Sequence, residues 1–257
     1  MPSRAKTRKI GLARALSKLG YCSRSQAAEL VRAGRVRLNG AVRRDPETPV
    51  RPERDRIAVD ETAVDPQQKI YLMMNKPRGL VTTASDEKGR ETVYSLFKGE
   101  SAPWVAPVGR LDKASEGLLL LTNDSEWAAR VAAPETHLEK TYHVQVGSLA
   151  AEELVEALIS GVRSDEGDLL RVRRASLLRS GEKNCWLEII LDEGKNRQIR
   201  RMLAALGVEV LRLVRVAVGS LQLGNLAKGE YRPLTPGEKA SLDRGMETYQ
   251  GRPAPHG

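Results

Sequence analysis

The pattern of apolar and polar positions divides the chain into a short segment of helices and a hairpin, followed by a longer segment rich in strands. Apolar residues recur at helical spacing between residues 11 and 19, and Ser23 opens a capping box for a second helix. The Asn39-Gly40 pair, set between two short alternating stretches, predicts a β-hairpin. Together these elements predict a compact unit over residues 10–60.

From residue 69 onward, strand patterns outnumber helix patterns. Apolar or alternating runs predict strands at 70–74, 105–110, 118–122, 141–146, 186–191 and 211–218. Helical spacing predicts helices at 125–132, 151–160 and 196–206. The fold class we expect is therefore α+β: a small α/β module followed by a larger domain built on a mainly antiparallel mixed sheet with flanking helices.

Prolines and polar residues separate the two segments. Four prolines mark the passage out of the first unit, and the stretch from Thr62 to Gln68 has the composition of a linker. We expect a flexible basic N-terminus at 1–9, a small domain at 10–60, a linker at 61–68, a larger domain at 69–244 and a disordered tail at 245–257.

Composition argues against several classes of protein. Of the 257 residues 40% are hydrophobic, but no apolar run approaches the roughly 20 residues of a membrane span. The basic N-terminus has no apolar stretch behind it, so we expect no secretory signal. Two isolated cysteines and three scattered histidines argue against a disulfide framework and a metal site. We expect a cytoplasmic, metal-free protein and, without a long apolar patch, a monomer.

Charge is unevenly distributed along the chain. Lys and Arg number 42 and Asp and Glu 33, a formal net charge of +9. Residues 1–60 hold 15 of the basic and 6 of the acidic side chains, so the whole excess lies in the first quarter of the chain. This asymmetry suggests a module that binds a polyanion, although a merely solvated basic surface is the alternative. The candidate nucleic-acid contacts in this module are Arg14, Lys18, Arg24, Arg32, Arg35 and Arg37.

The segment GRLDKASEGLLLLTND, residues 109–124, is the most informative in the chain. Its run Leu118–Leu121 is apolar without alternation, which is typical of a strand buried on both faces. The loop before this strand holds Asp112 between Arg110 and Lys113. Neighbouring cations favour an ionised carboxylate, which makes Asp112 a candidate nucleophile. An aspartate that caps a turn or forms a structural ion pair is the more common alternative.

The segment KTYHVQV, residues 140–146, carries a candidate aromatic residue. Strand alternation places Tyr142 on one face with Val144 and Val146, and His143 on the other face. Tyr142 is either an ordinary core aromatic or, in a chain with one Phe and six Tyr, one of few platforms on which a base could stack.

The segment DEGKNRQIRRM, residues 192–202, carries a run of basic residues. Helical spacing predicts a helix that has an apolar face and is capped by Asn196. Arg200 falls at the edge of the apolar face and can reach inward. A solvated basic face is the alternative for the whole run. The residues that project to the far side could, with Lys195, meet phosphate near the helix N-terminus; they are Arg197 and Arg201.

These segments resemble a known enzyme family. GRLDKASEGLLLLTND is similar to the catalytic motif of the RsuA/RluB-type pseudouridine synthases, bacterial enzymes that isomerise chosen uridines in ribosomal RNA. The two short helices and the hairpin ending in RVRLNG resemble the S4 RNA-binding domain that many of these enzymes carry. An ordinary small α+β domain is the alternative for this stretch.

The resemblance implies roles for single residues. It makes Asp112 the catalytic nucleophile, places Tyr142 against the target base and pairs Arg200 with the catalytic carboxylate. Many relatives have His where Arg197 stands, which leaves its role open, and Arg110 would help to open or orient the RNA. The reaction moves uracil from an N1 to a C5 linkage without oxidation or group transfer, so the resemblance implies no cofactor.

The expected function is therefore site-specific pseudouridine formation in ribosomal RNA, free or in ribosome assembly intermediates. The segment NRQIRRM resembles the large-subunit branch of the family, and this resemblance favours 23S over 16S RNA. A non-enzymatic RNA-binding or ribosome-assembly factor is the main alternative, because it needs the basic module but no ionised Asp112. An RNA methyltransferase would need a glycine-rich cofactor loop that the sequence lacks. A glycosidase using Asp112 and Glu116 would leave the basic module unexplained.

Overall fold

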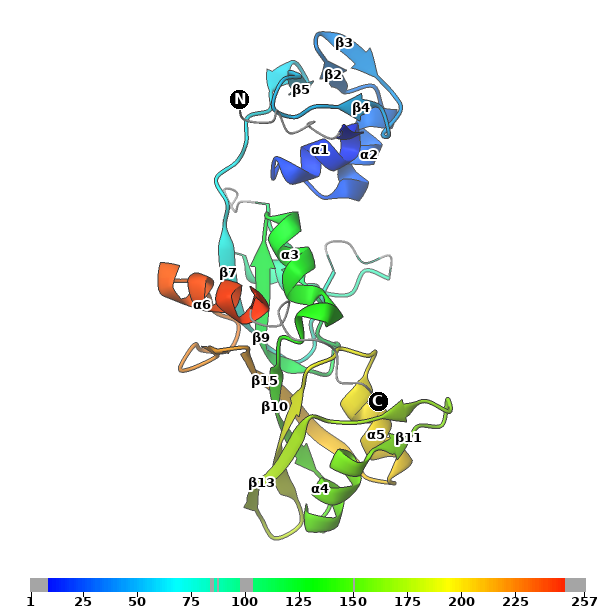
Figure 1. Cartoon of the computed structure of the whole chain (residues 1–257), viewed down its shortest axis with the longest axis vertical. Helices are drawn as coiled ribbons and strands as arrows, with labels where there is room; N and C mark the ends of the chain where they lie inside the picture. Colours follow the sequence, from blue (N-terminus) through cyan, green and yellow to red (C-terminus); the bar gives the residue numbers. More distant parts are fainter. Residues whose placement is uncertain (1–8, 84–85, 87, 98–103, 150, 248–257) are drawn as a thin grey trace, which may run out of the picture. The chain divides into compact units, whose positions relative to one another are not determined.

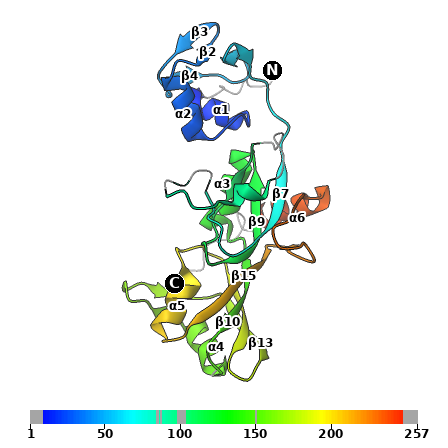
Figure 2. The ribbon, with the colours of Figure 1, turned by 180° about the vertical axis from the view of Figure 1, so that it is seen from behind.

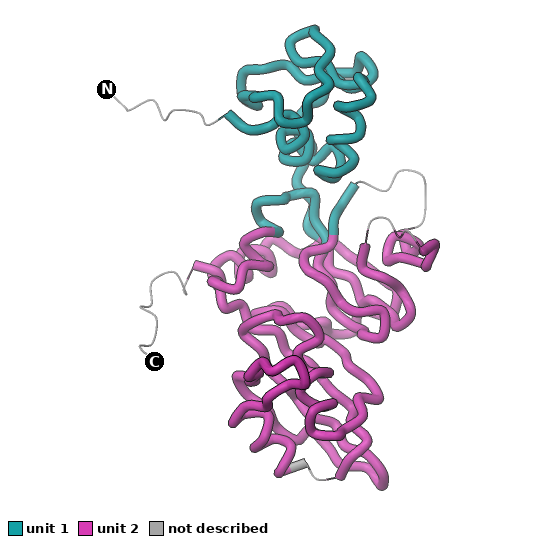
Figure 3. The backbone as a smooth tube through the Cα atoms, turned by 90° about the vertical axis from the view of Figure 1, so that its right-hand side faces the viewer, with its two compact units in different colours: residues 1–71, 101–106, 121–128 teal, residues 72–100, 107–120, 129–257 magenta. Residues whose placement is uncertain are grey.

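The computed structural model describes residues 9–83, 86, 88–97, 104–149 and 151–247. The chain forms two compact units, which are coloured separately in Figure 3. The first contains residues 1–71, 101–106 and 121–128, and the second contains residues 72–100, 107–120 and 129–257. The candidate catalytic residues Asp112, Tyr142 and Arg200 all belong to the second unit.

The first unit contains a small α/β module (Figure 1). Its antiparallel sheet has the order β3-β2-β5-β6, and β1 pairs separately with β4. The helices bury Leu12, Leu16 and Val31 in one cluster with Val36 and Val59 of the sheet. The elements are β1 (Ile10–Gly11), α1 (Leu12–Lys18), α2 (Arg24–Arg32), β2 (Val36–Leu38), β3 (Ala41–Arg43), β4 (Pro49–Val50), β5 (Ile57–Val59) and β6 (Thr62–Ala63).

Short sequence motifs account for the start of α2 and for the β2–β3 hairpin in this module. Ser23 Oγ accepts a hydrogen bond from the Gln26 amide at 3.1 Å, and the Gln26 side chain accepts one from the Ser23 amide at 3.0 Å, which confirms the predicted capping box. Asn39 and Gly40 have φ of 52° and 85°, as the predicted hairpin between β2 and β3 requires. The predicted linker, by contrast, begins too early, because β6 pairs with β5.

A nine-stranded sheet carries most of the second unit and confirms the expected mixed, mainly antiparallel architecture. The strand order is β13-β14-β10-β15-β9-β7-β17, with β16 on β15 and β8 on β9. The β9–β15 pair is parallel, whereas β10 is antiparallel to both β14 and β15. The strands are β7 (Tyr71–Lys76), β8 (Ala106–Val108), β9 (Glu116–Thr122), β10 (Lys140–Val146), β13 (Arg174–Ser180), β14 (Cys185–Leu191), β15 (Val210–Val218), β16 (Leu221–Gln222) and β17 (Tyr231–Pro233).

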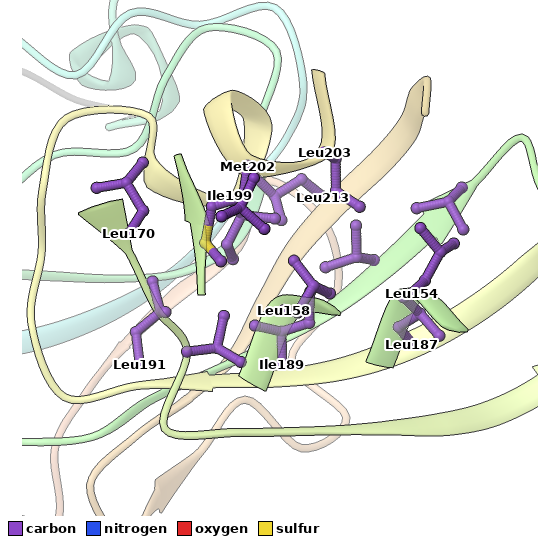
Figure 4. Packing of buried hydrophobic residues seen from close by; sticks show 14 of the residues in the cluster. Leu154, Leu158, Leu170, Leu187, Ile189, Leu191, Ile199, Met202, Leu203 and Leu213 are labelled. Atoms are coloured by element: carbon purple, nitrogen blue, oxygen red, sulfur yellow. The ribbon is translucent and has the colours of Figure 1, made fainter. Parts of the chain in front are cut away.

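Helices α4 and α5 pack against the part of the sheet formed by β10, β14 and β15 (Figures 1 and 2). Leu187 and Ile189 of β14 meet Leu158 of α4 and Met202 of α5 in one buried cluster (Figure 4). This packing holds α5 against the strand that carries the candidate tyrosine. None of the described helices is long and apolar enough to cross a membrane. The remaining elements are α3 (Ser125–Ala132), α4 (Ala151–Ser160), α5 (Gln198–Ala205), α6 (Pro236–Glu247), the 3-10 helices η1 (Val93–Leu96) and η2 (Pro134–Thr136), and the hairpin strands β11 (Val162–Arg163) and β12 (Leu169–Leu170).

The last helix differs from the prediction of a disordered tail after residue 244. Helix α6 continues to Glu247, and the rest of the predicted tail, residues 248–257, lies outside the described residues. Leu242 and Met246, four residues apart, are buried and anchor the last turns of the helix. Few other apolar residues mark this helix, so its periodicity gives a weak signal.

Gly117 allows β9 and β15 to approach closely. Its φ is +101°, and a Cβ at this position would lie 2.2 Å from the carbonyl oxygen of Arg215. Glycine satisfies both the backbone conformation and the lack of space. The approach places the loop before β9, residues 109–115, beside β15.

Candidate active site

A cavity of about 620 Å³ lies in the second unit, between the loop before β9, strands β10 and β15, and the N-terminal end of α5. Its apolar lining includes Leu120, Val131, Pro134, Leu191 and Val218. Five basic and two acidic side chains also line it: Arg110, Asp112, Lys140, Glu193, Lys195, Arg197 and Arg215. Among the described residues, no group of three or more His, Cys, Asp or Glu could hold a metal ion. A cavity that is both basic and apolar suits a nucleotide, with its anionic phosphate and flat base.

Lys76, the last residue of β7, holds the loop before β9 from within the protein. Its Nζ donates hydrogen bonds to the carbonyls of Pro77, Asp112 and Ser115 at 3.1, 3.2 and 2.8 Å. The residue is fully buried. Burial lowers the pKa of Lys76 to about 8, against the opposing charges of Asp112 and Glu116. The backbone of Asp112 is thus anchored by a buried cation.

The segment after β7 adds two more hydrogen bonds to the same loop. Thr82 Oγ1 donates to the carbonyl of Leu111 at 2.7 Å. The amide of Gly79 donates to the carbonyl of Lys113 at 2.8 Å. The residues on both sides of the candidate nucleophile are therefore fixed, which restricts where its carboxylate can point.

Glu116, the first residue of β9, follows the loop directly and forms ion pairs with two basic side chains. Arg212 donates to its carboxylate from Nε and Nη2, each at 3.0 Å, and Lys228 Nζ lies 2.6 Å away. Burial by itself would raise the pKa of Glu116, but the hydrogen bonds from Arg212 and Lys228 outweigh it and hold the pKa below its usual range. Because both of its oxygens are engaged by Arg212, Glu116 anchors the loop and makes a poor acid for the glycosidase alternative.

Asp112 is the loop carboxylate that lines the cavity. Its side chain is 29% exposed, and Arg197 Nη1 lies 3.9 Å from its Oδ2. Arg200 instead donates from Nη2 to the carbonyl of Ala114 at 3.1 Å, and its buried Nε has no hydrogen-bond partner among the described residues. Burial lowers the pKa of Arg200, as does the charge of Arg197, whereas Asp112 acts in the opposite direction. Arg200 thus holds the loop backbone, and Arg197 forms the ion pair.

The position of Arg197 corrects the helical prediction. Helix α5 begins at Gln198, and Arg197 is its N-cap, with a left-handed φ of 49°. Asn196 is therefore not the cap, and it lines the cavity instead. Since Arg197 precedes the helix and has a different backbone conformation, its side chain does not follow helical spacing and faces Asp112 rather than the far side.

The other basic candidates of this domain fall into two groups. Arg110 and Lys195 are exposed and line the cavity. Arg201 lies away from it, because its Nη2 is 2.8 Å from a carboxylate oxygen of Glu166 and 2.5 Å from one of Asp168. The geometry therefore brings Arg110 and Lys195, but not Arg201, to the candidate nucleophile.

Tyr142 and His143 lie on opposite faces of β10, as the alternation predicts. Tyr142 is half-buried, lines the cavity with Asp112 and pairs in register with Arg215 of β15. His143 lines a separate hollow of about 450 Å³, where its Nε2 lies 3.5 Å from Glu188. Of these two neighbouring residues, the strand therefore brings Tyr142, and not His143, to the candidate nucleophile.

Three cations around the site were not predicted from the sequence: Lys76, Lys140 and Arg215. Lys140 lies two residues before Tyr142 on β10. The alternation that places Val144 and Val146 on the face of Tyr142 also places Lys140 there, so the sequence pattern was sufficient to predict it. Arg215 is buried, and its Nε donates to the carbonyl of Leu118 at 2.7 Å. Lys76 and Arg215 come from strands far from the loop in sequence, and no local pattern connects them to it.

The candidate RNA-binding residues of the first unit also differ in whether an acidic side chain already occupies them. Arg14 and Arg32 are exposed and form none of the described ion pairs. The other four each pair with an acidic side chain: Lys18 with Glu126, Arg24 with Glu47, Arg35 with Asp60 and Arg37 with Glu61. Arg14 and Arg32 are thus the guanidinium groups most available to an RNA phosphate.

Comparison with known proteins places the chain among RNA-modifying enzymes. Residues 70–205 match the family model of RNA pseudouridylate synthases, and residues 10–57 match the S4 domain. Over 243 residues the chain is 35% identical to ribosomal large subunit pseudouridine synthase B of Bacillus subtilis, which covers 93% of this chain and 99% of the relative. Over 228 residues it is 38% identical to an uncharacterized RNA pseudouridine synthase of Aquifex aeolicus, covering 88% and 91%. A crystal structure of a pseudouridylate synthase matches with a TM-score of 0.63 and 32% identity, covering 91% of this chain and 99% of that one.

The fold and these similarities define an RNA pseudouridine synthase, an isomerase that acts on uridine in RNA. Within this class the chain belongs to the RsuA/RluB family, with an S4 RNA-binding domain at its N-terminal end. The resemblance seen in GRLDKASEGLLLLTND and in the first unit is thereby confirmed. Membership of this family favours an enzyme over the alternative of a non-enzymatic binding factor.

Proposed function

We propose that this enzyme forms pseudouridine at a specific site of 23S ribosomal RNA and that Asp112 is its catalytic nucleophile. The observation that carries the proposal is an Asp112 carboxylate in a basic cavity beside Tyr142, on a loop anchored by Lys76. The near full-length similarity to a large subunit synthase supports the choice of RNA. The substrate is either free 23S RNA or a large-subunit assembly intermediate in the cytoplasm.

The reaction requires a group that acts on the sugar as its bond to the base breaks. An oxygen of Asp112 bonds to C1′ of the target uridine, and N1 of uracil leaves with the electron pair of the C1′–N1 bond. The detached uracil turns, C5 bonds to C1′, and the carboxylate of Asp112 is released. C5 then loses its proton and N1 gains one, so product and substrate have the same atoms.

The residues around Asp112 position the substrate for this reaction. The target uridine must leave its stack, at a cost of a few kcal/mol. Stacking on Tyr142 and phosphate contacts with Arg110 and Lys195 offset that cost. Arg197 forms an ion pair with the carboxylate, and Arg200 holds the loop that carries it through the carbonyl of Ala114.

The substrate proposal is tested with 23S and 16S RNA transcribed from uridine that carries tritium at C5. Joining C1′ to C5 expels that hydrogen, so wild-type enzyme should release tritium from 23S RNA, free or in partly assembled particles. The 16S RNA should release none. Release from 16S RNA alone would contradict the choice of subunit, and release from neither would contradict the enzymatic proposal.

The S4 domain is expected to supply affinity through phosphate contacts. Replacing Arg14 and Arg32 together by Gln should weaken binding to 23S RNA by about 10-fold at 0.1 M salt, because two such contacts are lost. The slope of log K against log salt concentration should fall by about 2. Filter binding at several salt concentrations measures both quantities.

Arg35→Gln provides a matched control for this prediction. It removes the same charge per residue, but the Arg35 guanidinium is already paired with Asp60. Its effect on affinity should therefore be smaller than the effect per residue of the double variant. Equal effects per residue would show that net charge, and not the two available guanidinium groups, determines affinity.

A further inference from the structure

Lys140 is a cavity-lining cation that the proposed mechanism leaves without a role. It begins β10 two residues before Tyr142, so both side chains lie on one face of the strand and line the cavity with Asp112. Its register partners are Leu191 of β14 and Val218 of β15, which are buried and also line the cavity. Lys140 therefore lies within the apolar part of the cavity wall.

The ammonium group of Lys140 has no bound partner. Among the residues that the structure describes, it forms no hydrogen bond and no ion pair, whereas Lys76 donates to three carbonyls and Arg215 donates to one. Burial, together with the charge of Arg215, lowers the pKa of Lys140 to about 8, and the charge of Asp192 opposes this change. A desolvated cation that faces a cavity and is not itself paired with a carboxylate is suited to bind an anion there.

The substrate presents two kinds of anion to this cavity. The RNA phosphates are permanently charged, and the exposed Arg110 and Lys195 are placed to meet them. The second anion exists only during the reaction, when uracil has left C1′ with the electron pair of the glycosidic bond. Its charge is shared between N1 and the ring carbonyl oxygens, and its flat ring fits an apolar wall.

We propose, on the basis of the function proposed for this cavity, that Lys140 contacts the detached uracil and stabilises its negative charge. The ammonium group donates an N–H to a ring carbonyl oxygen and stays protonated throughout, so no proton transfer is required. Leu191 and Val218 exclude water from this contact, which strengthens the attraction between the two charges. Lys140 thus acts on the leaving base, while Asp112 acts on the sugar.

The experiment compares Lys140→Met with wild type in single-turnover tritium release from 23S RNA. At saturating enzyme, the rate should fall at least about 100-fold, because a group that stabilises developing charge is lost. The dissociation constant for RNA should change less than about threefold. The melting temperature should not fall, because Met removes a buried charge and keeps most of the side-chain volume. A merely structural Lys140 predicts the reverse, a lower melting temperature with an unchanged rate.

Lys183→Met serves as the control for the change of side chain. Lys183 is exposed between β13 and β14 and does not line the cavity. The same substitution there should leave rate, affinity and melting temperature at their wild-type values. A loss of rate shared by Lys183→Met and Lys140→Met would show that overall charge, and not the position of Lys140, is responsible.

The dependence of the rate on pH gives a second test. The wild-type rate should fall as pH rises through about 8, because the ammonium form is the active one. Lys140→Arg should keep part of the rate and lose this fall, since a guanidinium stays charged. If the rate of Lys140→Arg still falls above about pH 8, another charged or titrating group around the site causes the fall. These groups are Lys76, Arg110, Asp112, His137, Tyr142, Asp192, Glu193, Lys195, Arg197 and Arg215.

The outcomes separate this inference from the function on which it rests. A wild-type rate in Lys140→Met, or a defect confined to the dissociation constant, overturns the role of Lys140. If Lys140→Met does not fold, the pH profile of Lys140→Arg decides, and a fall identical to that of wild type overturns it. Failure of the wild-type enzyme to release tritium from any ribosomal RNA refutes the proposed function itself.

Discussion

Asp112→Asn is expected to lower the single-turnover rate of pseudouridine formation by more than about 1,000-fold. The amide has almost the size of the carboxylate, but it lacks the negative charge needed to attack C1′. The ion pair with Arg197 is long, at 3.9 Å, and partly exposed, so its loss should cost little stability. RNA affinity and melting temperature should therefore stay near their wild-type values. Mass spectrometry of 23S RNA digests, sampled over time with enzyme in excess, measures the rate.

Asp165→Asn is the matched control for this variant. Asp165 is an exposed turn residue between β11 and β12 and does not line the cavity. Its substitution makes the same chemical change and should leave the rate unchanged. A wild-type rate in Asp112→Asn would remove Asp112 from the chemistry and restore the alternative of a structural loop aspartate.

Lys76→Met is expected to destabilise the second unit by about 2–6 kcal/mol. Three hydrogen bonds from a charged donor contribute roughly 5–9 kcal/mol. Burial of the charge opposes them: a pKa of about 8 in place of 10.5 corresponds to about 3 kcal/mol. The hydrogen bonds outweigh this cost, so their loss decides the sign. The loosened loop should also reduce the rate about 10-fold to 100-fold, because the carboxylate of Asp112 loses its fixed position.

Urea denaturation at pH 7 and at pH 9.5 measures this effect and its pH dependence. The folded pKa of Lys76 lies below the unfolded one, so between about pH 8 and 10 the folded protein binds fewer protons at this site. Wild-type stability from this group therefore rises with pH, and the difference from Lys76→Met should be larger at pH 9.5. Lys183→Met, at an exposed position, should show neither effect. Equal stability of Lys76→Met and wild type at both pH values would contradict the anchoring role.

The parts of the site that the sequence predicted are those in which local spacing determines geometry. Asp112 lies in a loop directly before an apolar strand, and Tyr142 follows the alternation of a single strand, so each could be placed from its own segment. The capping box at Ser23 and the Asn39-Gly40 hairpin were predicted for the same reason. In each case the structure-determining contacts lie within a few residues along the chain.

The parts that could not be predicted depend on contacts between distant segments or on a single backbone angle. Lys76 reaches the loop of Asp112 across 36 positions in the sequence. Arg197 faces the same loop because its φ is positive, which helical spacing does not reveal. Strand β13 has mostly exposed residues without clear alternation, and its pairing with β14 identifies it as a strand. Sheet register and local strain thus determine which cations meet the carboxylate.

The cavity that holds Asp112 is the proposed site at which the enzyme isomerises uridine of 23S RNA. The most direct test incubates one preparation of 23S RNA, labelled with tritium at C5 of uridine, with wild type and with Asp112→Asn in parallel. Tritium release by wild type alone, at a stoichiometry of one site per RNA, is the predicted result. Equal release by both proteins would contradict the role of Asp112, and release by neither, from free RNA or from assembly intermediates, would contradict the proposed reaction on this RNA.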